Sequence, residues 1–119
     1  MRMSASEAKR LLAKSSPKPG KYRNVKVEHD GHTFDSKAEA RRYNELKLMK
    51  QAGEIKDFDL QPSFPLGKKI RYRPDFIVCG RDGTVWVEDV KGMETKEFKL
   101  KQKLWEERYW WMELRVIKY

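Results

Sequence analysis

Two apolar segments joined by a turn, within residues 69–91, constrain the fold of this chain more than any other feature. The first segment ends in Phe76-Ile77-Val78-Cys79, and the second contains Trp86-Val87-Glu88-Asp89-Val90. Between them, Gly80-Arg81-Asp82-Gly83 has the composition of a turn. The sequence therefore predicts a β-hairpin with strands over 69–79 and 84–91.

Further elements flank this hairpin on both sides. Asp30-Gly31 between short apolar segments predicts a second, tighter hairpin, and Ser36 with Glu39 three residues later forms a capping-box pattern at a helix start. The expected order is a hairpin over 25–34, a helix from Ser36 to about Gln51, a strand and an irregular edge segment within 54–66, the strands 69–79 and 84–91, a helix over 94–109 and a strand over 114–117. This order indicates an α/β protein with a mixed sheet.

The charge of the chain favours a polyanionic partner. In 119 residues, 27 Lys and Arg face 18 Asp and Glu, a net charge of +9, which points most often to nucleic acid. Residues 1–26 hold eight bases and one acid, or +7, whereas the rest hold nineteen bases and seventeen acids, or +2. We interpret residues 1–24 as a basic flexible arm with a short helix near 4–13, and 25–119 as one folded domain. Two roles are open for this arm: it attracts phosphate groups, or it only makes the chain more soluble.

Several classes of protein are excluded by simple patterns. Without a run of about 18 apolar residues or an apolar stretch near the N-terminus, we expect neither a membrane span nor a secretory signal. Cys79 is the only cysteine, so we expect no internal disulfide and a cytoplasmic location. Cys79, His29 and His32 cannot make a typical structural zinc site. No glycine-rich phosphate loop is present, so no nucleotide cofactor is expected.

Two aspartates on the central hairpin do not suit a purely structural interpretation. Asp75 follows Pro74 inside a predicted strand, where aspartate is disfavoured. Strand alternation places Asp89 and Lys91 on one face and Glu88 on the other, so it favours Asp89 over Glu88 as the partner of Asp75. The hairpin brings Asp75 and Asp89 within reach of each other. A simple salt bridge between Asp89 and Lys91 remains the alternative.

This arrangement suits metal-dependent phosphodiester chemistry. Two carboxylates held close repel unless they are protonated or bridged by a cation, and Mg²⁺ or Mn²⁺ is the usual bridge. Lys91 can hold a water or stabilise charge on a scissile phosphate. Glu39 on the first helix points toward the core face and is a third candidate acid, although its role as a helix cap is an equal alternative.

Basic and aromatic residues could contact DNA. Lys69, Arg71 and Arg73 have the same parity as Asp75 and would form a track of cations on its face of the strand. Lys96, Lys99 and Lys103 share a face of the second helix, which could equally be a solvated face. Three interpretations are open for the aromatic segment Tyr109-Trp110-Trp111-Met112: it is part of the core, a dimer contact or a base-stacking platform.

These residues resemble the PD-(D/E)xK nuclease superfamily through Glu39, Pro74-Asp75 and Asp89-Val90-Lys91. The wider pattern is similar to a family of small phage and prophage endonucleases, long catalogued as a domain of unknown function, that are similar to Holliday-junction resolvases. It consists of Phe34 to Ala40 with Tyr43 and Leu46, Gly53-Glu54-Ile55, Leu60-Gln61-Pro62-x-Phe64-x-Leu66, Tyr72-x-Pro74-Asp75-Phe76 and Glu88 to Gly92. The resemblance covers about residues 25–119.

The resemblance implies a restriction-endonuclease-like core of order αβββαβ and Mg²⁺-dependent cleavage of branched DNA by a homodimer, in the host cytoplasm if phage-encoded. It implies that Asp75, Asp89 and Glu39 hold the metal and that Lys91 is catalytic, with Gln61 and Glu88 near the site. Flaps, nicks or genome ends are alternative substrates, and a non-catalytic nucleic-acid-binding module is the alternative function.

Overall fold

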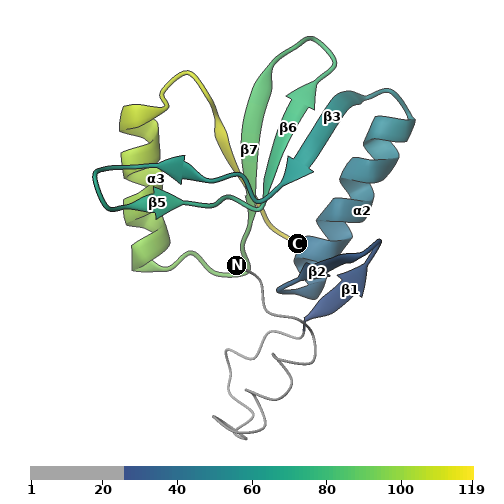
Figure 1. Ribbon diagram of the computed structural model, residues 1–119, viewed down its shortest axis with the longest axis horizontal. Coiled ribbons are helices and arrows are strands. Elements are labelled where there is room, and N and C mark those ends of the chain that lie inside the picture. Colours follow the sequence, from purple (N-terminus) through teal and green to yellow (C-terminus); the bar gives the residue numbers. More distant parts are fainter. Residues whose placement is uncertain (1–25) are drawn as a thin grey trace, which may run out of the picture. The chain divides into compact units, whose positions relative to one another are not determined.

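The computed structural model describes residues 26–119 (Figure 1). These residues fall into two compact units, one over 26–40 and one over Arg41–Tyr119. The expected basic arm, residues 1–24, lies outside the described residues. The elements are β1 (Val27–His29), β2 (His32–Phe34), α2 (Lys37–Gln51), β3 (Ile55–Leu60), β4 (Phe64–Pro65), β5 (Arg71–Tyr72), β6 (Phe76–Gly80), β7 (Val85–Val90), α3 (Lys96–Arg108) and β8 (Leu114–Ile117). The helix α2 begins in the first unit and continues into the second.

In the first unit, β1 and β2 form the predicted antiparallel hairpin, with Val27 opposite Phe34. Its turn residues Asp30 and Gly31 have φ angles of 53° and 77°. Both values lie in the left-handed region that Asp tolerates and Gly adopts freely, as a two-residue turn of this kind requires. The turn chemistry therefore accounts for the reversal of the chain between β1 and β2.

The second unit is built on a mixed four-stranded sheet of order β3-β6-β7-β8. The strands β3, β6 and β7 are antiparallel neighbours, and β8 lies parallel to β7. A parallel neighbour needs a crossover connection, which α3 provides between β7 and β8. The mixed sheet with two helices agrees with the expected α/β class.

Alternation along the strands gives the sheet two buried faces. On one face, the ring of Tyr43 from α2 packs edge-on against Phe58 at 5.7 Å, and Phe58 lies 6.4 Å from Phe76. The other face carries a core cluster in which α3 meets the sheet. This cluster consists of Leu66, Tyr72, Val87, Phe98 and Trp105. The strand β7 is buried on both faces, since Trp86, Val87, Glu88 and Asp89 are all buried.

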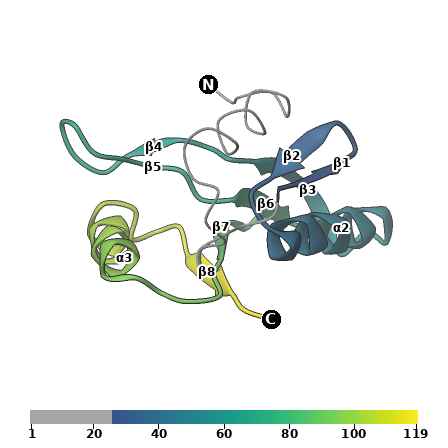
Figure 2. The same cartoon turned by 90° about the horizontal axis from the view of Figure 1, so that it is seen from below.

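The expected continuous strand over 69–79 is wrong. The strand β5 ends at Tyr72 and β6 begins only at Phe76, because Pro74 has no N–H to donate to a ladder. The strand β5 pairs instead with β4, opposing Phe64 to Tyr72, in a separate two-stranded ribbon. Figure 2 shows this ribbon extending away from the main sheet.

This break removes the basis for the expected track of cations. Lys69 lies in the bend between β4 and β5 rather than on a strand. The Nε of Arg71 donates to Ser63 Oγ at 2.9 Å, and Arg73 Nη2 lies 3.4 Å from Gln61 Oε1. The three side chains are exposed, but strand parity no longer places them together on the face of Asp75.

Candidate functional site

Asp75 lies at the entrance to β6, directly beside the end of β7. The ladder pairs Phe76 with Glu88, and the same register continued by one residue sets Asp75 opposite Asp89. Asp75 Oδ2 accepts a hydrogen bond from the Val90 N–H at 2.7 Å. The carbonyl of Asp75 accepts the N–H of Gln61 at 2.9 Å. Backbone N–H groups from two neighbouring segments therefore fix this aspartate next to β7.

Asp89 is a buried carboxylate with a different partner on each oxygen. Only 3% of the residue is exposed. The hydroxyl of Tyr72 donates to Oδ2, and Lys91 Nζ lies 3.4 Å from Oδ1. The Lys91 ammonium also lies 4.8 Å from the centroid of the Phe98 ring. Asp89 and Lys91 thus share a face, as strand alternation predicts.

Tyr72 completes this arrangement, although the sequence patterns do not identify it as a candidate site residue. Burial raises the pKa of Tyr72 well above its ordinary value, and the negative charges of Asp89 and Asp75 and the hydrogen bond to Asp89 raise it further. The phenol therefore stays protonated and acts as a donor to Asp89. The one feature of the sequence that could have indicated Tyr72 is its position between Arg71 and Arg73, where an aromatic side chain alternates with two cations.

Glu88 belongs to the opposite face and is held in an ion pair. Its two carboxylate oxygens accept from Arg42 Nε and Nη2, each at 2.8 Å, and Oε2 also accepts from Trp86 Nε1 at 2.9 Å. The hydrogen bond to Glu88 is the main cause that raises the pKa of Arg42 above its ordinary value. Glu88 is fully buried and directed away from Asp89, so it does not join the acidic pair.

Glu39 makes the contacts of a helix cap. Its N–H donates to Ser36 Oγ at 3.1 Å, and its Oε2 accepts from the Asp35 N–H at 3.3 Å. This is a capping box in which the glutamate reaches one residue further back than usual. Glu39 belongs to the unit that ends at Ala40, and its role as a metal ligand stays a prediction.

Gln61 lies beside Asp75 through its backbone, and its side chain accepts from Arg73. Its φ of 48° is uncommon for a residue other than glycine. Lys96, Lys99 and Lys103 are exposed along α3, where their spacing puts them on one side of the helix.

The carboxylates of Asp75 and Asp89 could hold a metal ion between them. Within residues 26–119, no group of three or more His, Cys, Asp or Glu side chains is placed to bind a metal. Two carboxylates are nevertheless a donor set that Mg²⁺ accepts, since this ion usually retains several waters. Hard oxygen ligands of this kind fit Mg²⁺ or Mn²⁺.

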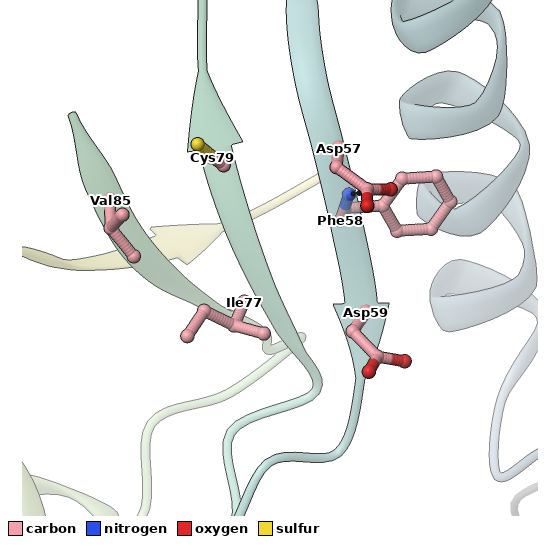
Figure 3. Close-up of a pocket in the computed structure, with 6 residues that line it drawn as sticks. All are labelled: Asp57, Phe58, Asp59, Ile77, Cys79 and Val85. Atoms are coloured by element: carbon pink, nitrogen blue, oxygen red, sulfur yellow. Dashed lines mark hydrogen bonds between the residues drawn. The ribbon is translucent and has the colours of Figure 1, made fainter. Parts of the chain in front are cut away.

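A separate shallow hollow of about 270 Å³ lies at the other end of β6 (Figure 3). It is lined by Asp57, Phe58, Asp59, Ile77, Cys79 and Val85. Asp57 is engaged there, because its Oδ1 lies 2.9 Å from Lys50 Nζ and accepts from the Phe58 N–H. These two hydrogen bonds hold the pKa of Asp57 below its ordinary value. The hollow contains none of the candidate site residues.

The fold and the site thus define a mixed α/β protein with two neighbouring aspartates, a lysine and a buried tyrosine at one end of its central hairpin. The chain belongs to a family described as "Protein of unknown function (DUF1064)", whose family model matches residues 19–119. Comparisons with curated proteins and with solved structures found no match. No helix within residues 26–119 combines the length and apolarity needed to cross a membrane.

Proposed function

We propose that this protein is a divalent-metal-dependent, structure-selective DNA endonuclease that cleaves branched DNA such as Holliday junctions. The observation that carries the proposal is the position of Asp75 at the end of the central hairpin, where its carboxylate accepts the N–H of Val90, the residue after Asp89, with Lys91 Nζ 3.4 Å from Asp89. This set of two acids and one lysine is the one on which the resemblance to PD-(D/E)xK nucleases rests.

The order of the elements supports the same assignment. The succession of α2, β3, β6, β7, α3 and β8 supports the proposal, because it is compatible with an αβββαβ core if the β4–β5 ribbon is treated as an insertion. Asp75 directly precedes β6 and Asp89 lies on the neighbouring β7, as the resemblance leads us to expect.

In this proposal, each side chain has a defined task. Asp75 and Asp89 hold Mg²⁺ or Mn²⁺, which supplies Lewis-acid stabilisation of charge on the scissile phosphate and a more acidic water. Tyr72 fixes the orientation of Asp89 through its hydroxyl. The ammonium of Lys91 orients the attacking water or donates to a phosphate oxygen as negative charge develops there. The exposed lysines of α3 contact the phosphate backbone.

Substitution of the site residues tests this proposal directly. Asp75→Asn and Lys91→Ala are expected to abolish cleavage of a labelled four-way junction in Mg²⁺ while leaving DNA binding intact. Removal of one such group costs two or more orders of magnitude in rate in comparable sites. Asp59→Asn and Lys50→Ala remove the same charges outside the site and should leave the rate unchanged. Cleavage by both site variants at the wild-type rate would show that the site is wrongly assigned.

A panel of substrates then defines the reaction. Junction, flap, nicked duplex and linear duplex DNA are compared in Mg²⁺, in Ca²⁺ and with a chelator. Preferred cleavage of the junction supports the proposal. A preference for flaps, nicks or ends would keep the nuclease activity but assign it one of these as its substrate instead of the junction. Salt-sensitive binding without divalent-dependent cleavage on any of them indicates a non-catalytic module. Sedimentation with and without the junction tests whether two copies act together.

A further inference from the structure

Two tryptophans lie largely in solvent on the turn between α3 and β8. Trp110 and Trp111 are 79% and 61% exposed, whereas Tyr109 and Met112 pack against the core cluster. Of the interpretations open for this segment, core therefore applies to Tyr109 and Met112 and not to the tryptophans between them. A pair of large aromatic rings left in water indicates a binding surface.

The turn that carries these rings is firmly held. Trp105 Nε1 donates to the Met112 carbonyl at 2.8 Å, and the Met112 N–H donates to the Tyr109 carbonyl at 2.9 Å. The Tyr109 hydroxyl donates to the Pro65 carbonyl at 2.7 Å, which ties the turn to the β4–β5 ribbon. The two tryptophans are thus presented on an ordered backbone, which lowers the entropic cost of binding a ligand on them.

The chemistry around the rings favours nucleotides over an apolar partner. Trp111 lies 5.5 Å from the Tyr109 ring and 5.8 Å from the Trp110 ring, at an interplanar angle of 83° to the latter. Arg108 precedes them, with its guanidinium 5.9 Å from the Tyr109 ring, and further back α3 carries three exposed lysines, interspersed with exposed Glu97, Glu106 and Glu107. Aromatic rings next to cations are the combination that binds single-stranded nucleic acid, since bases stack on the rings and phosphates meet the charges.

The turn continues into β8, and the far end of this strand lies beside the candidate site. The Val87 N–H donates to the Glu113 carbonyl at 2.9 Å, and Val116 is paired with Asp89 in the parallel ladder. Figure 1 shows this connection in yellow, running from the end of α3 down into the sheet. A nucleic-acid strand following β8 from the tryptophans would therefore reach the acidic pair.

We infer that Trp110 and Trp111 form a stacking platform for unpaired nucleotides of the DNA substrate. This inference rests on the proposed nuclease function and deepens it: the enzyme selects DNA that carries unpaired bases on one side of the cleaved bond. The platform contributes affinity and selectivity, and the acidic pair and Lys91 carry out the cleavage.

Tryptophan fluorescence with two kinds of oligonucleotide tests the platform. The other two tryptophans, Trp86 and Trp105, are 8% and 1% exposed, so quenching by added DNA reports mainly on the exposed pair. Poly-dT should quench the emission, and an abasic strand of equal length and charge should bind more weakly. The double variant Trp110→Ala/Trp111→Ala lacks this reporter, so its affinity is measured from the anisotropy of labelled strands; affinity for poly-dT should fall about tenfold or more, with little change for the abasic strand.

Matched variants keep the result specific. The variant Trp110→Phe/Trp111→Phe retains flat rings and should keep most of the affinity for poly-dT. The variant Met93→Ala removes another apolar side chain, which is 76% exposed, and should leave the affinity for poly-dT unchanged. Equal affinity for poly-dT and the abasic strand, or unchanged binding by the alanine variant, overturns the inference. A change from dimer to monomer with unchanged binding also overturns it and assigns the rings to a second copy.

This design distinguishes a failure of the stacking platform from a failure of the proposed nuclease function, because binding is measured in Ca²⁺, without cleavage. Loss of base-dependent binding in the alanine variant supports the platform even if no substrate is ever cleaved. Conversely, junction cleavage that depends on Asp75 together with base-independent binding supports the nuclease and overturns the platform.

Discussion

At the scale of single residues, Tyr72 and Tyr109 each donate one hydroxyl hydrogen bond, but their acceptors differ in charge. Tyr72 donates to the buried carboxylate of Asp89, and Tyr109 donates to the neutral carbonyl of Pro65. Because a hydrogen bond to a charged group contributes about 1.5–3 kcal/mol and a neutral one about 0.5–1.5 kcal/mol, Tyr72→Phe should destabilise the protein more than Tyr109→Phe. Urea unfolding in metal-free buffer measures both.

The same pair of variants separates a structural from a positioning role for Tyr72. Tyr72→Phe should also slow junction cleavage at saturating DNA, because Asp89 loses one of the groups that orient it. Tyr109→Phe, as the control for loss of a hydroxyl, should leave the rate unchanged. Equal stability losses together with equal rates would contradict the assigned role of Tyr72.

The residue scale also shows how far the sequence predicts the site. Alternation along a strand is rigid, so the shared face of Asp89 and Lys91 and the opposite direction of Glu88 follow from the sequence alone. Tyr72 could not be found in this way, because its contact with Asp89 depends on how the chain leaves the ladder at residues 73–75. The partner of Glu88 was equally hidden, since Arg42 lies 46 residues away on a helix.

At the scale of elements, the β6–β7 hairpin depends on the absence of a side chain at Gly80. A Cβ there would lie 2.9 Å from Trp86 Cζ3 and 3.2 Å from the Thr84 carbonyl. The Trp86 ring cannot easily yield, because it is hydrogen-bonded to Glu88 and stacked 3.9 Å from the Arg115 guanidinium. Gly80→Ala should therefore lower the free energy of unfolding by about 1–3 kcal/mol.

Gly67→Ala is the matched control, because a Cβ at Gly67 would meet nothing within 4 Å. Its free energy of unfolding should stay within about 0.5 kcal/mol of the wild-type value. Chemical denaturation of both variants gives the comparison. A Gly80→Ala protein as stable as Gly67→Ala would mean that the hairpin adapts without cost.

Elements with local signals were predicted, and those that depend on distant pairing were not. Asp30-Gly31 specifies its turn, and the last strand was expected over the residues of β8, Leu114–Ile117. The strands β4 and β5 have two residues each, too few for any periodicity, and they are defined by the pairing of Phe64 with Tyr72 and of Pro65 with Arg71. Pro74 indicated an irregularity, but not that the chain would turn to a different partner.

At the scale of the whole molecule, residues 1–26 carry a net charge of +7 out of the total of +9. Deleting residues 1–24 removes seven bases and one acid. Binding to duplex DNA should weaken, and the slope of log affinity against log salt should shrink by about 0.9 for each phosphate that the protein no longer neutralises. Cleavage at saturating enzyme should persist, because Asp75, Asp89 and Lys91 remain.

Titrations at several salt concentrations measure this slope, with cleavage assayed in parallel. Because the family match begins at residue 19, a shorter deletion of residues 1–18 provides the control that leaves the matched region whole. Loss of all cleavage at saturation in both deletions would contradict the assignment of this segment to phosphate attraction alone.

The burial of β7 on both faces has a consequence for how this protein can change over evolution. Glu88 and Asp89 are sequence neighbours with incompatible surroundings, one facing a guanidinium and the other a phenol and an ammonium. Insertion or deletion of one residue in this strand would exchange the two acids between these surroundings. Length variation among descendants of this sequence should therefore be confined to the turn at Arg81–Gly83 and to the segment after Lys91, while the six residues of β7 keep their number.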